Sequence, residues 1–151
     1  MKLVSIENGW VFAKYKIDNR EYCLQGSNMF GYDVIEELLS LIYIFIRNEE
    51  CQRHIVWNQE SDFYVGEYLN DNGNIIMRLY YCDKVCDGSV ITYRAFNLET
   101  LKVVFEEKKE LWLWAKEMYM DICKLYNESI GDENINNSIK ELLNKISFYF
   151  K

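Results

Sequence analysis

Hydrophobic and polar positions alternate along the first part of the chain. Over residues 10–17 apolar side chains recur at every second position, which is the period of a half-buried strand. Asp18 and Asn19, two residues that favour turns, separate this stretch from a second strand-like run at 20–24. The pattern predicts a β-hairpin followed by a loop over residues 26–31.

The apolar period lengthens to that of a helix after residue 33. Asp33 can cap a helix that begins at Val34, and Glu36 completes a pair like a capping box. Apolar residues then recur at helical spacing, and the second half, which includes the nine-residue run 38–46, is apolar nearly all round. We therefore expect a helix buried between a sheet and another helix.

Short strand-like runs return in the middle of the chain. They cover residues 54–57, 63–69, 75–82, 89–96 and 101–105, with turn or loop signals at 70–74 and 83–88. Connections this short cannot cross over between parallel strands, so we expect antiparallel pairing.

Two helical patterns complete the chain. From Glu106 the period becomes 3.6, and Glu106, Glu107 and Glu110 occupy the expected first turns, where carboxylates complement the helix dipole. Gly131 is expected to end this helix. A last helix carries an apolar stripe from Ile135 to Phe150, and a shorter version of it would be capped by Ser138 with Glu141.

These elements predict one α+β domain over residues 1–151, in the order ββ-α-βββββ-αα. An antiparallel sheet of five or more strands would pack about three helices on one face. The expected core combines the apolar faces of the helices with alternate strand positions: Trp10 or Val11, Leu38, Ile42, Phe45, Met77, Leu79, Trp114, Met118, Ile122, Ile139 and Ile146.

Composition narrows the class of protein. Half of the 151 residues are apolar, 16% are aromatic and proline is absent, which excludes an intrinsically disordered chain. With 24 acidic and 17 basic residues the formal charge is −7, and the basic residues are dispersed. Such a chain repels the nucleic-acid backbone, so direct nucleic-acid binding is not expected.

The N-terminus lacks the apolar stretch of a signal peptide, and the longest apolar run is too short to span a bilayer. Five scattered cysteines are an odd number and do not suggest a disulfide framework. We expect a cytoplasmic protein with reduced thiols that does not bind membranes.

Candidate catalytic and metal-binding groups are few. Cys51, His54, Cys82 and Cys86 offer one loose zinc combination, and Cys51 with His54 offers a nucleophile and a base. Carboxylates that follow one another closely, such as Glu60 and Asp62, are the third option, but acid–base work needs two carboxyls on facing elements. None of these patterns is specific, so we expect no enzyme activity, no cofactor and no metal.

Acidic and aromatic residues are mixed over one turn and strand, which makes this the best candidate for a partner-binding surface. Its members are Trp57, Glu60, Asp62, Tyr64, Glu67, Tyr68 and Asp71. Carboxylates can steer a basic partner, and exposed Tyr and Trp can anchor it. In the alternative arrangement the aromatic residues turn inward as core and the acids form a solvated outer face.

The order of elements over residues 30–130 resembles small bacterial α+β proteins of unassigned function and, more loosely, the immunity proteins of bacterial toxin systems. The resemblance is carried by a buried helix, a strand ending in Trp57, the acidic turn Glu60-Ser61-Asp62, Tyr64, and the polar hairpin Asp71-Asn72-Gly73. A meander and a long helix from Glu107 to Tyr126 follow. The Pro-Gly that such proteins often carry in the acidic turn is missing here.

The resemblance implies a non-enzymatic binding role and assigns no functional residue. We therefore expect an immunity or inhibitor protein that neutralises a basic toxin, nuclease or other nucleic-acid-binding protein. The alternatives are a small enzyme with an unrecognised carboxylate or Cys/His site, and a homo-oligomeric structural protein. An inhibitor protein is itself compatible with a homodimer.

Overall fold

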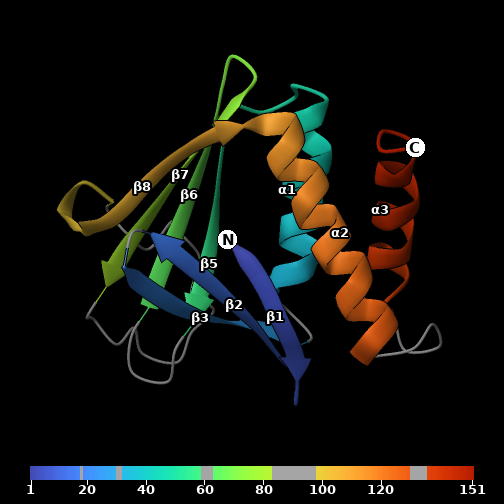
Figure 1. Cartoon of the computed structure of the whole chain (residues 1–151), viewed down its shortest axis with the longest axis horizontal. Coiled ribbons are helices and arrows are strands. Elements are labelled where there is room, and N and C mark those ends of the chain that lie inside the picture. The colour runs from blue at the N-terminus through green and yellow to red at the C-terminus, as the bar shows by residue number, and fades with distance from the viewer. Residues whose placement is uncertain (18, 30–31, 59–62, 83–97, 130–135) are drawn as a thin grey trace.

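The computed structural model describes residues 1–17, 19–29, 32–58, 63–82, 98–129 and 136–151. Within them the chain forms an α+β fold with two antiparallel sheets beside three α-helices (Figure 1). The first sheet contains, in spatial order, β1 (Lys2–Glu7), β2 (Trp10–Ile17), β3 (Arg20–Met29) and the two-residue β4 (Tyr32–Asp33). The second contains β5 (Gln52–Asn58), β6 (Phe63–Asp71), β7 (Asn74–Cys82) and β8 (Lys102–Glu110), which follows the 3-10 helix η2 (Leu98–Thr100).

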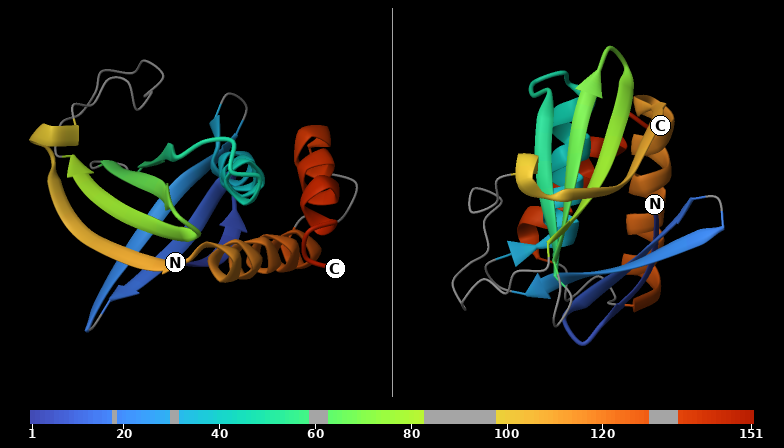
Figure 2. Two further views of the ribbon diagram at one scale, coloured as in Figure 1. Left: turned by 90° about the horizontal axis from the view of Figure 1, so that it is seen from above. Right: turned by 90° about the vertical axis from the view of Figure 1, so that its left-hand side faces the viewer.

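The α+β class and the antiparallel pairing are confirmed. The expected single sheet of five or more strands is not confirmed, because the described strands divide into two sheets on either side of α1 (Val34–Ile46) in the chain. The strands of the two sheets cross at a steep angle (Figure 2). The expected strand at 89–96 and the expected helix end at Gly131 lie outside the described residues.

Helix α1 is the centre of the helical layer. Its Asp33 cap accepts hydrogen bonds from the backbone N–H groups of Ile35 and Glu36. The helix contacts β3 and β5 on one side, and α2 (Leu111–Ser129) and α3 (Asn137–Ser147) on the other. The expectation of a helix between sheet and helices is therefore confirmed.

The core fills the space between the two sheets and α1 and α2. Every residue expected in the core is buried, and of the first pair it is Val11 rather than Trp10 that is fully enclosed. Alternate positions of β2 and β7 belong to this one core cluster, and the apolar faces of α1 and α2 complete it. Burial of this area is the main source of stability.

The boundary between β8 and α2 differs from the expectation. Glu106, Glu107 and Glu110 belong to β8, which pairs with β7 as far as the Asn74–Glu110 register. The helix begins only at Leu111, and the Glu110 carboxylate accepts hydrogen bonds from the backbone N–H groups of Trp112 and Leu113. The three carboxylates therefore do not form the first turns of the helix; the ladder to β7 outweighs local helix preference there.

Two strand connections are tight Asn-Gly turns. Asn72 and Gly73 have φ values of 49° and 81° between β6 and β7, and Asn8 and Gly9 have 51° and 81° between β1 and β2. Two successive residues with positive φ suit the right-handed twist of a hairpin. The first turn lies where the sequence predicts one; β1 and its turn were not predicted. The last helix is capped by Asn136, not by Ser138.

Candidate functional site

The predicted partner-binding surface lies on β5 and β6, and the structure divides its members between two faces. Trp57 and Tyr68 are fully buried and Tyr64 is half-buried, all on the face toward the core. Glu67 and Asp71 lie on the opposite face of the sheet, where Glu67 is only 5% exposed and where Val56, Phe63 and Cys82 form a second, smaller apolar cluster. Glu60 and Asp62 lie outside the described residues. Among the described members, the aromatic residues therefore face the main core, and the acids lie on the other face, where Glu67 is buried and Asp71 half-buried.

Glu67 is the centre of a polar network on this second face. Its Oε1 accepts a hydrogen bond from Gln52 Nε2 at 2.7 Å and lies 3.5 Å from His54 Nε2. Its Oε2 accepts hydrogen bonds from Tyr80 Oη at 2.9 Å and Arg78 Nη1 at 3.2 Å. The three strands β5, β6 and β7 each supply a group, because the register places His54, Glu67 and Arg78 in one row.

The network sets the ionisation of Glu67 and His54. Burial opposes ionisation of Glu67, but hydrogen bonds from Tyr80, Gln52 and Arg78 outweigh burial, so the pKa of Glu67 lies below its ordinary value. Burial lowers the pKa of His54, and the neighbouring Glu67 carboxylate only partly opposes this. At neutral pH the pair therefore consists of an ionised carboxylate and a neutral imidazole.

The same contacts define what this carboxylate can do chemically. A carboxylate offers about four lone-pair positions; Glu67 accepts hydrogen bonds from Gln52, Tyr80 and Arg78, and His54 Nε2 lies 3.5 Å away. An acceptor with three donors is a poor general base, because a substrate proton would have to compete with them. The geometry supports a structural role in which Glu67 ties three strands together.

Asp71, Arg78 and Glu106 extend this face of the sheet toward β8. Lys108 Nζ lies 2.7 Å from Asp71 Oδ2, and Arg78 bonds to Glu106 as well as to Glu67. Asp71 is thus already in a salt bridge within the molecule. Such exposed pairs contribute little stability, and the pair partly neutralises the charge that Asp71 would present to a partner.

The cysteine and histidine combinations are separated by the strand register. Cys82 pairs with Phe63 at one end of β7, whereas His54 lies in the Glu67 row. Four residues along a strand correspond to about 13 Å, which is too far for shared zinc coordination. Cys51 is exposed and precedes β5. Cys86 lies outside the described residues.

Acidic residues that were not predicted as a surface lie at the start of α1 and in the segment between α1 and β5, and Arg53 of β5 links the two groups. We call them together the α1 acidic surface; its acidic members are Asp33, Glu36, Glu37, Glu49 and Glu50, and Arg47 and Arg53 are its basic members. Arg53 joins two of the carboxylates, at 3.7 Å from Glu37 and 3.3 Å from Glu50. Five acids against two bases leave an excess of negative charge.

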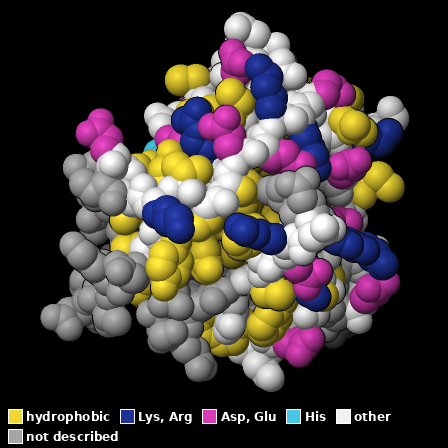
Figure 3. Space-filling view, turned by 60° about the vertical axis from the view of Figure 1, so that its left-hand side comes forward, with side chains coloured by type: hydrophobic (Ala, Val, Ile, Leu, Met, Phe, Trp, Pro, Cys, Tyr) yellow, Lys and Arg dark blue, Asp and Glu magenta, His cyan; other side chains and the backbone are white. Residues whose placement is uncertain are grey.

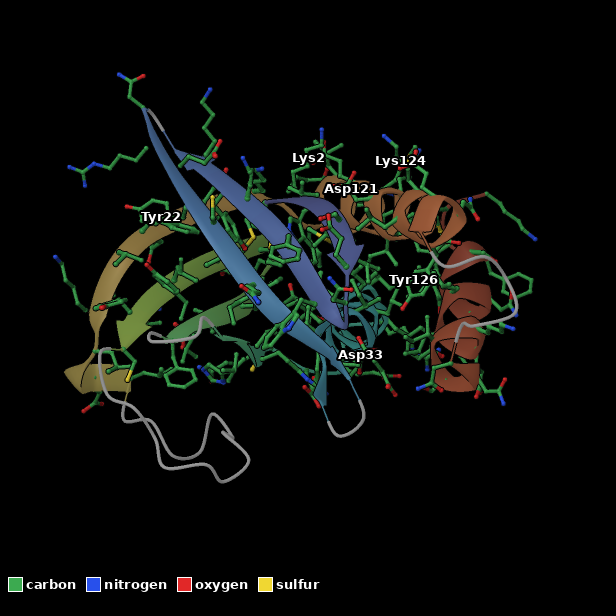
Figure 4. The ribbon with its side chains drawn as sticks, turned by 90° about the horizontal axis from the view of Figure 1, so that it is seen from below. Lys2, Tyr22, Asp33, Asp121, Lys124 and Tyr126 are labelled. Atoms are coloured by element: carbon green, nitrogen blue, oxygen red, sulfur yellow. The ribbon has the colours of Figure 1, made fainter. Side chains whose placement is uncertain are left out.

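The carboxylates at the start of α1 affect the pKa of a buried tyrosine of α2, Tyr126. Burial raises the pKa of Tyr126 in α2, and the nearby carboxylates of Asp33 and Glu36 raise it further. Figure 4 shows Asp33 and Tyr126 at the same end of the helical layer. In that view Asp121 lies between Lys2 and Lys124, and its Oδ2 accepts a hydrogen bond from the Leu3 backbone N–H.

Charge elsewhere on the described molecule is nearly balanced. The described residues hold 17 acidic and 15 basic side chains, a formal charge of −2, so the other 7 acidic and 2 basic residues supply most of the total of −7. Figure 3 shows acidic and basic side chains interspersed on one face, beside an area where hydrophobic side chains gather. The α1 acidic surface is therefore more negative than the rest of the residues that the structure describes.

Exposed apolar side chains gather on the helices. Trp112, Leu113 and Met120 of α2 and Phe148 after α3 are the largest of them on this layer. Phe150 packs its ring against those of Trp112 and Tyr119, with centroids 5.1 and 5.5 Å apart. In the sequence, this surface can be recognised from apolar residues of α2 that fall outside its buried stripe: Trp112, Leu113 and Met120.

Among the described residues, no helix has the length and apolar character needed to cross a membrane. A comparison with known proteins found no matching family model, curated protein or solved structure.

Proposed function

We propose that this protein is a non-enzymatic protein-binding module that inhibits a basic partner, in the manner of an immunity protein acting on a toxin or a nuclease. The observation that carries the proposal is the α1 acidic surface, where five carboxylates stand against two basic groups. The chain as a whole is acidic as well. Opposite charges accelerate the encounter of two proteins and select against acidic competitors.

The position of these carboxylates favours binding. Glu36 and Glu37 stand in the first turn of α1, and Glu49 and Glu50 follow its end; the apolar face of this helix is buried against both sheets and two helices. A rigid support lowers the entropy that a binding surface loses when a partner docks. Arg53 lies between Glu37 and Glu50 and forms a salt bridge with each. Both carboxylates are therefore partly ordered before a partner binds.

The acidic turn with Glu60 and Asp62 stays part of the proposed interface, and so does Asp71. The buried side chains of Trp57 and Tyr68 are better assigned to the core. The resemblance in element order that the sequence suggests implies the same function, and we propose a cytoplasmic location from the scattered, odd-numbered cysteines.

The test begins with capture of a partner by the tagged protein from a lysate of its own source, followed by identification by mass spectrometry. The partner is then purified, and its binding and its activity are measured with and without this protein. We expect a basic protein whose activity falls on binding. A Glu36→Lys/Glu50→Lys variant should bind at least about tenfold more weakly, as expected for reversed charge at an interface.

The matched control is Glu141→Lys on α3, whose exposed carboxylate pairs with Lys145. This variant reverses one carboxylate, where the test variant reverses two, on a helix outside the α1 acidic surface, and it should bind like the wild type. An acidic partner, or equal binding by the double variant and the control, would contradict the proposal.

A further inference from the structure

The outer side of α2 carries an apolar row at a spacing of seven residues. Leu113 is 52% exposed and Met120 is 59% exposed. Seven residues make nearly two helical turns, so both side chains lie within about 20° of one line along the helix. Exposed apolar residues aligned in this way mark an interaction surface more often than isolated ones do.

Two opposite charges flank this row. Lys116 and Glu117 lie between Leu113 and Met120 in sequence, and each is displaced by about 50° from the row, on opposite sides. Both side chains are exposed. The only salt bridge of α2 within the described residues joins Lys124 to Glu128, so Lys116 and Glu117 take part in none there.

We propose that this face of α2 binds a second copy of the chain, with the two α2 helices side by side and parallel about a two-fold axis. A two-fold axis along the helices places Leu113 against Leu113 of the second copy and Met120 against Met120. It also brings Lys116 of each copy to the flank that holds Glu117 of the other, so that two symmetric salt bridges close the apolar row on both sides.

The charges select the parallel orientation. In an antiparallel pair, the same flank of both helices comes together, so Lys116 would face Lys116 and Glu117 would face Glu117. Like charges at these positions oppose association. The left view of Figure 2 shows α2 at one edge of the molecule with α1 on its inner side, and the exposure of Leu113 and Met120 makes the outer side of the helix accessible to a second copy.

The dimer is independent of the proposed inhibitory function but has a consequence for it. The row lies on α2, and the α1 acidic surface remains uncovered, so a dimer presents two such surfaces. Two linked surfaces bind a partner with repeated sites more tightly than one, through a higher effective concentration.

The experiment is analytical ultracentrifugation of the purified full chain over a wide concentration range. We expect a reversible monomer–dimer equilibrium for the wild type. Lys116→Glu and Glu117→Lys, each alone, place like charges together and should raise the dissociation constant at least about tenfold. The double variant Lys116→Glu/Glu117→Lys restores opposite charges across the axis and should return the constant to within about threefold of the wild type.

Met120→Glu should give a monomer, whereas Phe148→Glu, which changes a 74% exposed side chain outside the row, should leave the dimer intact. Circular dichroism confirms that each variant is folded, which is expected because all these side chains are exposed. A monomeric wild type, a dimer that survives Met120→Glu, or a double variant no better than the single ones would overturn the proposal. Binding of a basic partner by a monomeric Met120→Glu variant would leave the proposed inhibitory function standing.

Discussion

The hydroxyl of Tyr15 in β2 lies 3.4 Å from the hydroxyl of Tyr68 in β6, so a buried hydrogen bond joins the two sheets. Burial raises the pKa of both side chains, which keeps them protonated at neutral pH. Gly66 makes room for the contact, because a Cβ there would lie 3.0 Å from the Tyr68 ring. Two sheets that share no strand pairing are thus connected by side chains.

Removing either hydroxyl should destabilise the protein by leaving its partner unsatisfied in the core. We expect Tyr15→Phe and Tyr68→Phe each to cost about 1–2 kcal/mol in the free energy of unfolding. The double variant leaves neither hydroxyl without the other, so its cost should be less than the sum of the two single costs, by about 1 kcal/mol in a double-mutant cycle. Urea denaturation of the two single variants and the double variant measures this. Additive effects would show that the hydroxyls act independently.

Gly26→Ala should destabilise the contact between β3 and α1. A Cβ at Gly26 would lie 2.8 Å from Cγ2 of Val34, whose β-branched side chain has little rotamer freedom in a helix. We expect a cost of about 1–3 kcal/mol, measured by urea denaturation. Val34→Ala in the Gly26→Ala background should recover part of it.

Gly73→Ala is the matched control for this position. Nothing lies within 4 Å of an added Cβ at Gly73, but its φ is +81°. The cost there should be about 1 kcal/mol, from the left-handed backbone alone, and Val34→Ala should not reduce it. Equal responses of both glycine variants to Val34→Ala would show that overpacking is not the cause.

His54 is the only histidine, so its titration can be followed directly by proton NMR. Because burial is the largest influence on its pKa, we expect a value below the ordinary one of about 6.5. The Glu67 carboxylate favours the charged ring, so Glu67→Gln should lower the pKa of His54 further. A higher pKa in Glu67→Gln would contradict the arrangement of this pair.

The local elements were predictable from the chain, and their assembly was not. Helix α1, with its Asp33 cap, and the turn at Asn72-Gly73 each follow from residues close in sequence. Pattern alone does not tell whether strands before and after a helix share a sheet, because that depends on contacts between distant segments. The strand β1 was missed although Asn8-Gly9 is a strong hairpin signal; the short run before it mixes apolar and polar positions.

The predicted site shows the same limit. The alternation over β6 correctly indicated two faces, but sequence could not say which face pointed inward. Tyr68 and Trp57 complete the main core on one face, and Glu67 is buried on the other. The α1 acidic surface depends on Arg53 of β5 reaching Glu37 of α1, a contact between segments that local patterns do not relate.

Ionisation of Glu67 should make stability depend on pH. Its pKa is lower in the folded protein than in the unfolded chain, so its contribution is complete above the unfolded value of about 4.3 and is lost as pH falls through the folded value. The wild type should therefore lose more stability on acidification below this range than Glu67→Gln does. Urea denaturation at several pH values measures the difference, and parallel curves for the two proteins would exclude this role.

Salt should act mainly on association with the basic partner. The Debye length falls from about 10 Å at 0.1 M to about 3 Å at 1 M, so the attraction exerted by the α1 acidic surface is screened as salt rises. In surface plasmon resonance we expect the wild-type association rate to fall markedly between these concentrations while dissociation changes less. Glu36→Lys/Glu50→Lys should slow association at low salt and show a weaker salt dependence, whereas Glu141→Lys should follow the wild type. Trp57→Ala, by contrast, removes a fully buried ring and should lower the unfolding free energy by about 3–5 kcal/mol. Salt-independent association of the wild type would mean that the carboxylates of α1 do not steer the partner.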